Sequence, residues 1–414
     1  MERLAQITPS PEPDPTWRGW LSYIAEASDL LASILDEQRA MALVAQLVVP
    51  RLAVWCAVYA DEDSGPACVW HTDEEQIETL RTHLAQFLPS PAVFAGPLAG
   101  SGPIQVPWTA PVAEEVYVVP LVARGRRLGL MVIGGERIPD WSLELAEELS
   151  RRAALAIDNA RLYAAQTAMS RALQRSLLPY GLPEIPGVEV AVVYEPAGEG
   201  AEVGGDFYDL FDGPPDEASR TVSWRFAIGD VCGTGPEAAA VTGLARHALR
   251  ILAAEAMPVP DVLDRLNRLI LGEGPRARLL TLLHGEISLR GEGRGIRLDL
   301  VNAGHPPPLI LGMDGSIHPA TSPQPLLGVL DDIKYESELV LMDPGDVLLC
   351  VTDGVTERRS HGRMLGDDRG LERLLASCGG LSAGAVAARV QRAVRDFGTV
   401  PSNDDVAIVV LRAS

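Results

Sequence analysis

Four aspartates stand at the edges of strand-like runs, each beside small residues. They are Asp206 in Gly204-Gly205-Asp206, Asp230 in Gly229-Asp230-Val231, Asp353 in Thr352-Asp353-Gly354 and Asp404 in Asn403-Asp404-Asp405. Carboxylates that converge at strand ends repel one another and lose hydration, so their convergence makes sense if a cation lies among them. Oxygen ligands without His or Cys suit hard ions. The residue types therefore predict a site for Mg²⁺ or Mn²⁺, with water in the remaining octahedral positions.

Each motif taken alone has a simpler interpretation. An Asp-Gly pair after a strand, such as Asp353-Gly354, is usually a turn, because both residues tolerate the backbone angles that a turn requires. Gly-Gly-Asp alone is also found in nucleotide cyclases, although here Phe207 and Tyr208 follow it without the further acidic residue that would support that function. The four motifs in this order are far more specific than any one of them.

The composition predicts a soluble protein of two domains. The chain has 414 residues, 47% of them hydrophobic, which exceeds one comfortable globular core. Its 35 Lys and Arg against 56 Asp and Glu give a net charge of -21, which disfavours nucleic acid or an anionic membrane as the main partner. No apolar run reaches the roughly 18 residues of a membrane helix, and the start does not resemble a signal peptide. Five scattered cysteines without a C-x-x-C pair are typical of reduced thiols, so a cytoplasmic location is expected.

The pattern along the chain predicts four parts. These are a disordered Pro-rich tail at 1–19, a first domain at 20–141, a connector helix at 142–178 and a second domain at 179–414. The connector contains no Gly or Pro, and Ser142 can cap its start. One of its faces carries Leu149, Ala153, Ile157, Ala160 and Ala164. This face predicts a homodimer in which two connectors pair, and the alternative is a helix that packs on its own domain.

Hydrophobic periodicity gives a coarse outline of the two domains. In the first, 20–45 and 76–87 have helical spacing, 52–59, 67–70, 116–123 and 128–133 are strand-like, and the Pro- and Gly-rich stretch 89–111 is expected to be loop. In the second, strands are expected at 188–194, 222–228, 279–287, 296–301, 347–352 and 406–411, with helices at 236–256, 259–271, 369–377 and 383–397. Hairpin-like strands with helices set aside predict an α+β fold with a mainly antiparallel sheet.

The motifs together resemble those of metal-dependent serine/threonine protein phosphatases of type 2C. The bacterial branch is the one typified by the stage II sporulation phosphatase and the general-stress sigma regulators. The resemblance covers about residues 173–412 and rests on Gly204–Asp209, Gly229–Gly233, Asn302–Pro307, Thr352–Gly354 and Asp404–Asp405. It implies a sandwich of two antiparallel sheets flanked by helices, with two Mg²⁺ or Mn²⁺ ions at one edge.

The resemblance also implies a role for each motif residue. Asp230 would bridge both ions, Asp353 and Asp404 would hold the first, and Asp206 with the backbone carbonyl of Val231 would hold the second. Water bound to the metals would be the nucleophile, so neither a protein nucleophile nor a further cofactor is implied. The implied substrate is phosphoserine or phosphothreonine on a regulatory protein, a STAS-type antagonist of an anti-sigma factor.

The sequence departs from the branch at two positions. Cys232 and Thr234 stand where the branch usually has Ser and His, so the general acid is left open. His305 is one candidate, and a structural residue of a Pro-rich loop is the other interpretation of it. Asp209 is expected in packing or behind the ligands, and Asp405 is the weaker neighbour of Asp404. No arginine matches the phosphate-binding one of eukaryotic relatives, so the metals are expected to anchor the phosphate.

The first domain resembles a GAF sensory domain. The resemblance rests on the strands within Val116–Ile133 and on Ala154–Leu162 at the exit, and a PAS-like sensor is the rival fold. Cys56 and Cys68 are expected to be packing residues rather than sites of pigment attachment. The leading function is thus a sensor-regulated protein phosphatase. The alternative is a catalytically degenerate module that binds a partner, and an anti-sigma kinase finds no glycine-rich ATP lid.

Overall fold

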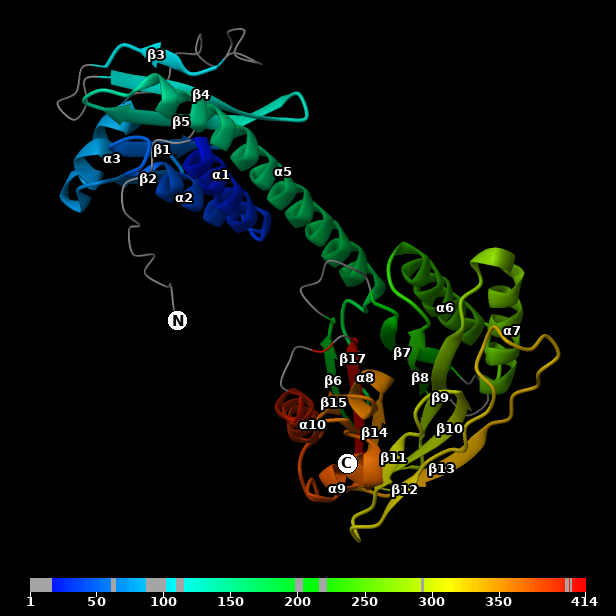
Figure 1. Cartoon of the computed structure of the whole chain (residues 1–414). Helices are drawn as coiled ribbons and strands as arrows, with labels where there is room; N and C mark the ends of the chain where they lie inside the picture. The colour runs from blue at the N-terminus through cyan, green and yellow to red at the C-terminus, as the bar shows by residue number, and fades with distance from the viewer. Residues whose placement is uncertain are drawn as a thin grey trace. The chain divides into compact units, whose positions relative to one another are not determined.

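The computed structural model describes residues 17–60, 65–86, 102–108, 115–197, 204–215, 222–291, 294–398, 402 and 404–414. It divides the chain into two compact units, Met1–Gln166 and Thr167–Ser414 (Figure 1). Helix α5 (Asp140–Leu177) begins in the first unit and ends in the second, and it overlaps the connector expected at 142–178. Among the residues described, no helix is long and apolar enough to cross a membrane. Most of the expected tail at 1–19 and of the expected loop at 89–111 lies outside the described residues.

The first unit is built on an antiparallel sheet with the strand order β2-β1-β5-β4-β3. The strands are β1 (Trp55–Tyr59), β2 (Cys68–His71), β3 (Ile104–Val106), β4 (Glu115–Ala123) and β5 (Arg126–Gly135). Helices α1 (Trp17–Ala32) and α2 (Glu37–Val48) lie with α5 on one face, and α3 (Ile77–Gln86) follows the short η1 (Glu74–Gln76). The sequence reading is wrong at two places here. Residues 20–45 form two helices, because the Asp36 side chain caps α2 by accepting from the Arg39 N–H at 2.8 Å, and 104–106 is a strand.

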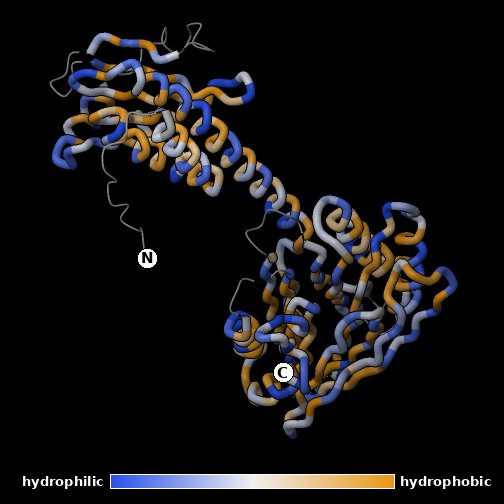
Figure 2. The backbone as a smooth tube through the Cα atoms, viewed as in Figure 1, coloured by the Kyte–Doolittle hydropathy of each residue, from blue (hydrophilic) through white to orange (hydrophobic). Residues whose placement is uncertain are grey.

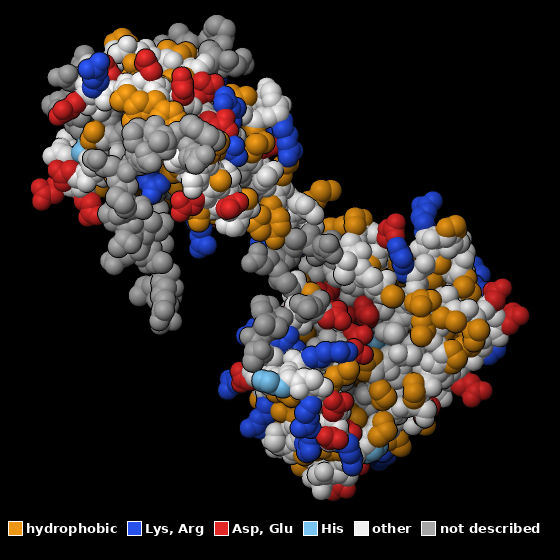
Figure 3. Space-filling model, in the orientation of Figure 1, with side chains coloured by type: hydrophobic (Ala, Val, Ile, Leu, Met, Phe, Trp, Pro, Cys, Tyr) orange, Lys and Arg blue, Asp and Glu red, His pale blue; other side chains and the backbone are white. Residues whose placement is uncertain are grey.

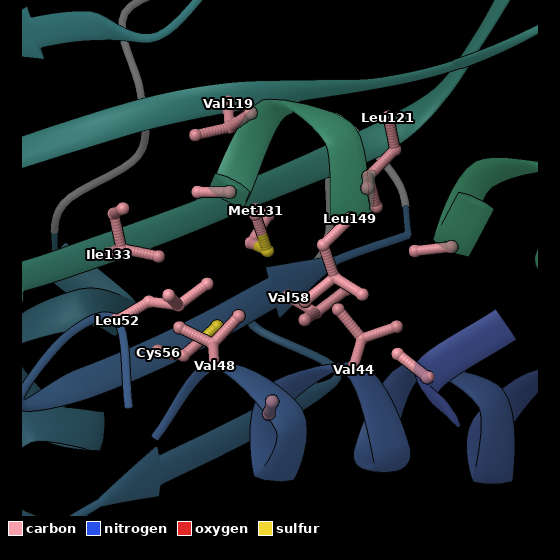
Figure 4. Close-up of a cluster of buried hydrophobic side chains, with 14 of the residues drawn as sticks. Val44, Val48, Leu52, Cys56, Val58, Val119, Leu121, Met131, Ile133 and Leu149 are labelled. Atoms are coloured by element: carbon pink, nitrogen blue, oxygen red, sulfur yellow. The ribbon is translucent and has the colours of Figure 1, made fainter. Parts of the chain in front are cut away.

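One face of α5 is buried in the core of the first unit. Figure 4 shows Val44 and Val48 of α2 near Cys56 of β1 and Met131 of β5, with Leu149 of α5 above them. Cys56 is fully buried among apolar side chains, in agreement with a packing role.

The α5 face that the sequence analysis assigned to a dimer seam lies in this core. Leu149 and Ala153 are 0% exposed and Ile157 is 1% exposed. The predicted seam is therefore wrong for these residues, which pack on their own domain, whereas Ala164 at the end of the same face is exposed.

The second unit contains two five-stranded sheets, in the orders β13-β10-β9-β8-β7 and β12-β11-β14-β17-β6, and neighbouring strands in both sheets pair antiparallel. The first contains β7 (Asp206–Pro215), β8 (Val222–Val231), β9 (Leu280–Leu289), β10 (Ile296–Ala303) and β13 (Glu338–Met342). The second contains β6 (Val188–Glu195), β11 (Leu309–Leu311), β12 (Ile317–Pro319), β14 (Val347–Val351) and β17 (Val406–Ala413). A small hairpin joins β15 (Arg359–Ser360) to β16 (Arg363–Met364).

The helices cover the outer faces of the two sheets (Figure 1). They are α6 (Pro236–Ala254), α7 (Val259–Gly272), the one-turn α8 (Asp353–Thr356), α9 (Gly370–Ala376) and α10 (Ala383–Phe397), with short turns η2 (Gly274–Arg276) and η3 (Asp367–Arg369). Helices α6 and α7 pack on the β7–β10 side, and α9 and α10 pack on the β14–β17 side.

Successive side chains of a strand point to opposite faces of its sheet, and this explains the layered arrangement. In β8, Phe226 and Ile228 face the second sheet, while Ala227 and Val231 face α6 and α7. Figure 2 shows the matching run of hydrophobic colour along the strands of this unit. The expected α+β fold, a sandwich of antiparallel sheets flanked by helices, is confirmed for this unit. Strand β7, which carries Asp206, was not expected from the sequence.

Candidate metal centre

Strand pairing brings the first two aspartates face to face. Asp206 is the first residue of β7 and is the direct partner of Asp230 in the antiparallel pair of β7 with β8. Directly opposed residues in such a pair project to the same side of the sheet, and like charges at these positions are destabilising. The arrangement therefore costs stability unless another charge compensates it.

Asp353 reaches the same place from the other sheet. It follows β14 and begins the single turn α8, where Thr352 is the N-cap residue. One carboxylate oxygen from each of Asp206, Asp230 and Asp353 lies within 4.8 Å of the others. The three side chains thus meet at the edge where the two sheets of the sandwich come together, as the sequence analysis expected of them.

Three oxygens of this cluster lack the hydrogen-bond partners that buried charges need. Both oxygens of Asp206 and Oδ1 of Asp353 are buried without a hydrogen-bond partner among the described residues. Burial, and then the charge of Asp230, raise the pKa of Asp206 well above its ordinary value. Burial and the charge of Asp353 raise the pKa of Asp230 to about 7, and burial also raises the pKa of Asp353. A divalent cation would relieve both causes, so this donor set fits Mg²⁺ or Mn²⁺.

Asp404 lies near the cluster but outside it. Its side chain is exposed, and its negative charge contributes to the raised pKa of Asp230 and of Asp353. It is not among the three residues whose oxygens lie within 4.8 Å of one another. The adjacent Asp405 is different, since only 2% of it is exposed. Its carboxylate accepts from the Ala197 N–H at 2.7 Å and from the Tyr194 hydroxyl at 3.2 Å.

The backbone carbonyl of Val231 also lies at this edge. The Val231 N–H donates to the Gly205 carbonyl at 3.2 Å, which holds the end of β8 against the loop before Asp206. A Cβ built on Gly205 would lie 2.1 Å from the Val231 carbonyl oxygen and 2.5 Å from Oδ1 of Asp230. Only glycine fits there, so the second glycine of Gly204-Gly205-Asp206 is required by the close approach of two candidate ligands.

Asp209 belongs to packing and not to the cluster. Its side chain is fully buried and forms ion pairs with Arg246 at 3.2 Å and Arg250 at 2.7 Å, both from α6. Two hydrogen bonds from Arg250 hold the carboxylate in a bidentate manner. The pairs fix α6 against β7, the strand that begins with Asp206.

His305 lies behind the cluster. Its Nδ1 is 3.2 Å from the hydroxyl of Thr281, the residue of β9 that stands opposite Asp230. His305 is 1% exposed, and burial lowers its pKa to about 3, so the ring is neutral. This environment suits a structural contact better than proton donation to a leaving group. Cys232 is a free, exposed thiol, and its N–H donates to the Leu279 carbonyl at 2.8 Å.

Figure 3 shows acidic side chains gathered on one face of the second unit, beside Lys and Arg side chains. Sequence reasoning missed the residues that hold this edge together, namely Tyr194 and Gln174 near Asp405, and Thr281 near His305. No motif marks them, because their positions depend on strand register and on the docking of α5.

Comparisons with known proteins point to the same unit. Residues 221–414 match the family described as stage II sporulation protein E (SpoIIE). Protein IcfG of Synechocystis is 32% identical over 235 residues, which cover 50% of this chain and 35% of that protein. The phosphoserine phosphatase RsbU of Bacillus subtilis is 22% identical over 241 residues, 58% of this chain and 68% of RsbU. RsbP of the same organism, also a phosphoserine phosphatase, is 30% identical over 162 residues, 38% of each chain.

Solved structures of similar proteins overlap mainly with part of this chain. The SiaA PP2C domain of Pseudomonas aeruginosa has a TM-score of 0.49 at 21% identity, covering 63% of this chain and all of that domain (100%). The RsbU and RsbW domains of Rv1364c from Mycobacterium tuberculosis have a TM-score of 0.46 at 26% identity, covering 57% of this chain and 63% of that one. The region that matches IcfG spans about a third (35%) of the length of that curated relative.

Proposed function

Since residues 221–414 match the family described as stage II sporulation protein E, we propose that the second unit is a PP2C-type serine/threonine phosphatase domain and that the chain hydrolyses phosphoserine or phosphothreonine on a regulatory protein. The observation that carries the proposal is the cluster of Asp206, Asp230 and Asp353, with buried oxygens that have no partner in the described structure. Carboxylates in this state are suited to hold a divalent cation, the cofactor that such a reaction needs.

The proposed ligands are those that the family resemblance implied. In this proposal Asp230 would be shared by two ions, Asp353 and Asp404 would hold one, and Asp206 with the Val231 carbonyl would hold the other. Divalent cations bound here supply Lewis acidity, which activates water and neutralises charge on the phosphoryl oxygens. The chain contributes an edge of fixed shape, in which the β7–β8 ladder sets Asp206 opposite Asp230 and the turn after β14 presents Asp353.

The substrate we propose is a STAS-type antagonist of an anti-sigma factor. Support comes from the relatives RsbU and RsbP, which are phosphoserine phosphatases. We place the protein in the cytoplasm and assign sensing to the first unit, as a GAF-like domain. The runner-up is a degenerate domain that only binds a partner. The retention of the carboxylate cluster with raised pKa values disfavours it, because a module without a cation would keep that cost for no purpose.

A second copy of the chain is proposed to pair along α5 on a face other than the one first considered. Leu155, Leu162 and Met169 recur every seven residues and are 47%, 48% and 76% exposed. A heptad stripe of exposed apolar side chains is typical of a coiled-coil seam. The seam therefore lies on the side of α5 opposite the buried Leu149 and Ile157.

The direct test is phosphate release from a phosphoserine peptide by the full-length protein with Mn²⁺. We expect release that EDTA abolishes and that fresh Mn²⁺ restores. Asp230→Asn should reduce turnover by at least a hundredfold, because the proposed bridge loses its charge, while the circular dichroism spectrum stays unchanged. The matched control is Asp331→Asn, which removes an exposed carboxylate away from the cluster and should leave turnover unaltered. Release that persists in EDTA, or that survives Asp230→Asn within threefold, would refute the metal-dependent phosphatase.

A further inference from the structure

A chain of hydrogen bonds joins the last turns of α5 to Asp405, the buried neighbour of Asp404. The Gln174 side-chain amide donates to the Tyr194 hydroxyl at 2.8 Å, and that hydroxyl donates to Oδ2 of Asp405 at 3.2 Å. Oδ1 of Asp405 accepts from the Ala197 N–H at 2.7 Å. The three side chains come from α5, β6 and the residue just before β17, which are far apart in the sequence.

Because Gln174 and Asp405 are buried, loss of one of these hydrogen bonds leaves a polar group without a partner. Gln174 is 6% exposed and Asp405 is 2% exposed. A buried carboxylate is stable only when its oxygens are satisfied, and the tyrosine hydroxyl can accept from Gln174 while it donates to Asp405. Loss of the Tyr194 hydroxyl would leave Oδ2 of Asp405 without this donor, and the carboxylate would shift towards another partner.

Asp405 in turn contacts both chain segments that carry candidate ligands. Its own N–H donates to Oδ1 of Asp404 at 3.0 Å. A Cβ built on Gly204 would lie 1.4 Å from Oδ2 of Asp405, so the loop before Asp206 presses directly on this carboxylate. The backbone of Asp206 also hydrogen-bonds to this carboxylate. A displacement of the Asp405 side chain would therefore move Asp206 and Asp404 together.

The end of α5 is anchored in the second unit at a further point. The Leu177 carbonyl accepts a hydrogen bond from Arg246 of α6, the residue that also pairs with the buried Asp209. Residues from Thr167 onward belong to this unit, so both anchors lie within it. Gln174 is thus held in a fixed place next to Tyr194, one helical turn before the Arg246 contact.

We propose that Tyr194 is a positioning residue of the metal centre, acting through Asp405, and that Gln174 of α5 holds Tyr194 in the position that favours cation binding. This rests on the proposed function, in which Asp206 and Asp404 hold divalent ions. The link runs from a neutral amide through a hydroxyl to a carboxylate, so loss of either neutral partner would change the metal affinity through Asp405.

The test is Mn²⁺ binding by the full-length protein, followed by electron paramagnetic resonance of the free ion and thus independent of activity. Tyr194→Phe should weaken Mn²⁺ binding about tenfold, because one hydrogen bond to a buried carboxylate is lost. Gln174→Leu should weaken it about threefold while leaving the helix intact. The double variant should bind no more weakly than Tyr194→Phe alone, because Gln174 acts through Tyr194.

The matched control is Tyr208→Phe. The Tyr208 ring centroid lies 6.3 Å from that of Tyr194, and its hydroxyl makes no hydrogen bond within the described part of the chain. Mn²⁺ affinity should stay within twofold of the wild type in this control, and thermal unfolding in EDTA should show that every variant is folded. A wild type that binds no Mn²⁺ refutes the proposed function itself. A wild type that binds Mn²⁺, with Tyr194→Phe and Gln174→Leu within twofold of it or with additive effects in the double variant, overturns only the relay.

Discussion

Gly354 lies directly against the backbone of Asp405: a Cβ built on Gly354 would be 1.8 Å from the Asp405 carbonyl oxygen. Gly354 follows Asp353 in the single turn α8, and Asp405 follows Asp404 just before β17. The contact therefore joins the two chain segments that carry Asp353 and Asp404. One segment follows β14 and the other precedes β17, and these two strands belong to the same sheet. The close approach of two backbones, rather than a left-handed turn, is the reason for glycine after Asp353.

Substitution of Gly354 should separate these two carboxylates. We expect Gly354→Ala to weaken Mn²⁺ binding at least tenfold, since the methyl group cannot be accommodated without moving Asp353 away from the cluster. Gly384→Ala in α10 is the matched control, because a Cβ there meets nothing within 4 Å. The control should bind Mn²⁺ like the wild type and gain up to about 1 kcal/mol in free energy of unfolding. Equal Mn²⁺ titrations for both variants would show that the contact is not needed.

Removal of one buried carboxylate should stabilise the metal-free protein. Asp206 is 4% exposed, and burial with the charge of Asp230 raises its pKa, so its ionised form opposes folding at neutral pH. In EDTA we expect Asp206→Asn to melt at a higher temperature than the wild type. With Mn²⁺ the order should reverse, because only the wild type gains stability from the ion. Calorimetry of both proteins in both buffers checks this, and a variant that melts lower in EDTA would contradict it.

The pH dependence of the metal-free protein follows from the same charges. The pKa of Asp230 is raised to about 7, above its unfolded value, so its contribution to stability is present at low pH and is lost as the pH rises through 7. In EDTA the free energy of unfolding should fall between pH 5 and pH 8, by on the order of 2 kcal/mol from this group. Asp230→Asn should lose that part of the slope. Urea unfolding at several pH values measures it, and equal slopes for both proteins would contradict the assignment.

The sequence predicted the aspartates of the site, but not all of the strands and hydrogen bonds that position them. The three clustered aspartates could be found because each carries a local signature of small residues at a strand end. Strand β7 was missed, since Asp206–Pro215 contains three aspartates and two prolines in place of a clear apolar alternation. The roles of Asp405 and Tyr194 depend on the packing of β6 beside β17, which pairs residues more than 200 positions apart.

For the connector, the sequence predicted the helix but not which of its faces is buried. Its helical period was evident, but two of its faces carry apolar residues, and periodicity alone does not say which one the first unit buries. Ala153 and Ile157 on one face suggested a helix pair, and in fact they lie in the core that α5 shares with α2 and the sheet of the first unit. The large exposed residues at seven-residue spacing are the ones on which the proposed pairing with a second copy rests.

Cys232 should be dispensable for turnover. Its thiol is exposed and free, and it lies two positions beyond Asp230 without the phosphate-binding loop that a cysteine nucleophile needs. We expect Cys232→Ser to retain at least half of the Mn²⁺-dependent rate and to be insensitive to iodoacetamide. Steady-state rates before and after alkylation of both proteins test this. Inactivation by the serine substitution would indicate covalent catalysis and overturn the metal-dependent mechanism.

The two faces of α5 should respond differently to the same charge. Leu162 is 48% exposed on the stripe proposed to meet a second copy, whereas Ile157 is 1% exposed in the core of the first unit. Leu162→Glu should therefore dissociate the dimer with little change in the melting temperature of the first unit, because no core contact is lost. Ile157→Asp should unfold that unit, since a buried, unpaired carboxylate costs several kcal/mol. Sedimentation velocity at about tens of micromolar, with circular dichroism of each variant, separates the outcomes. A monomeric wild type would refute the proposed dimer, and a dimer that survives Leu162→Glu would place the second copy on another face.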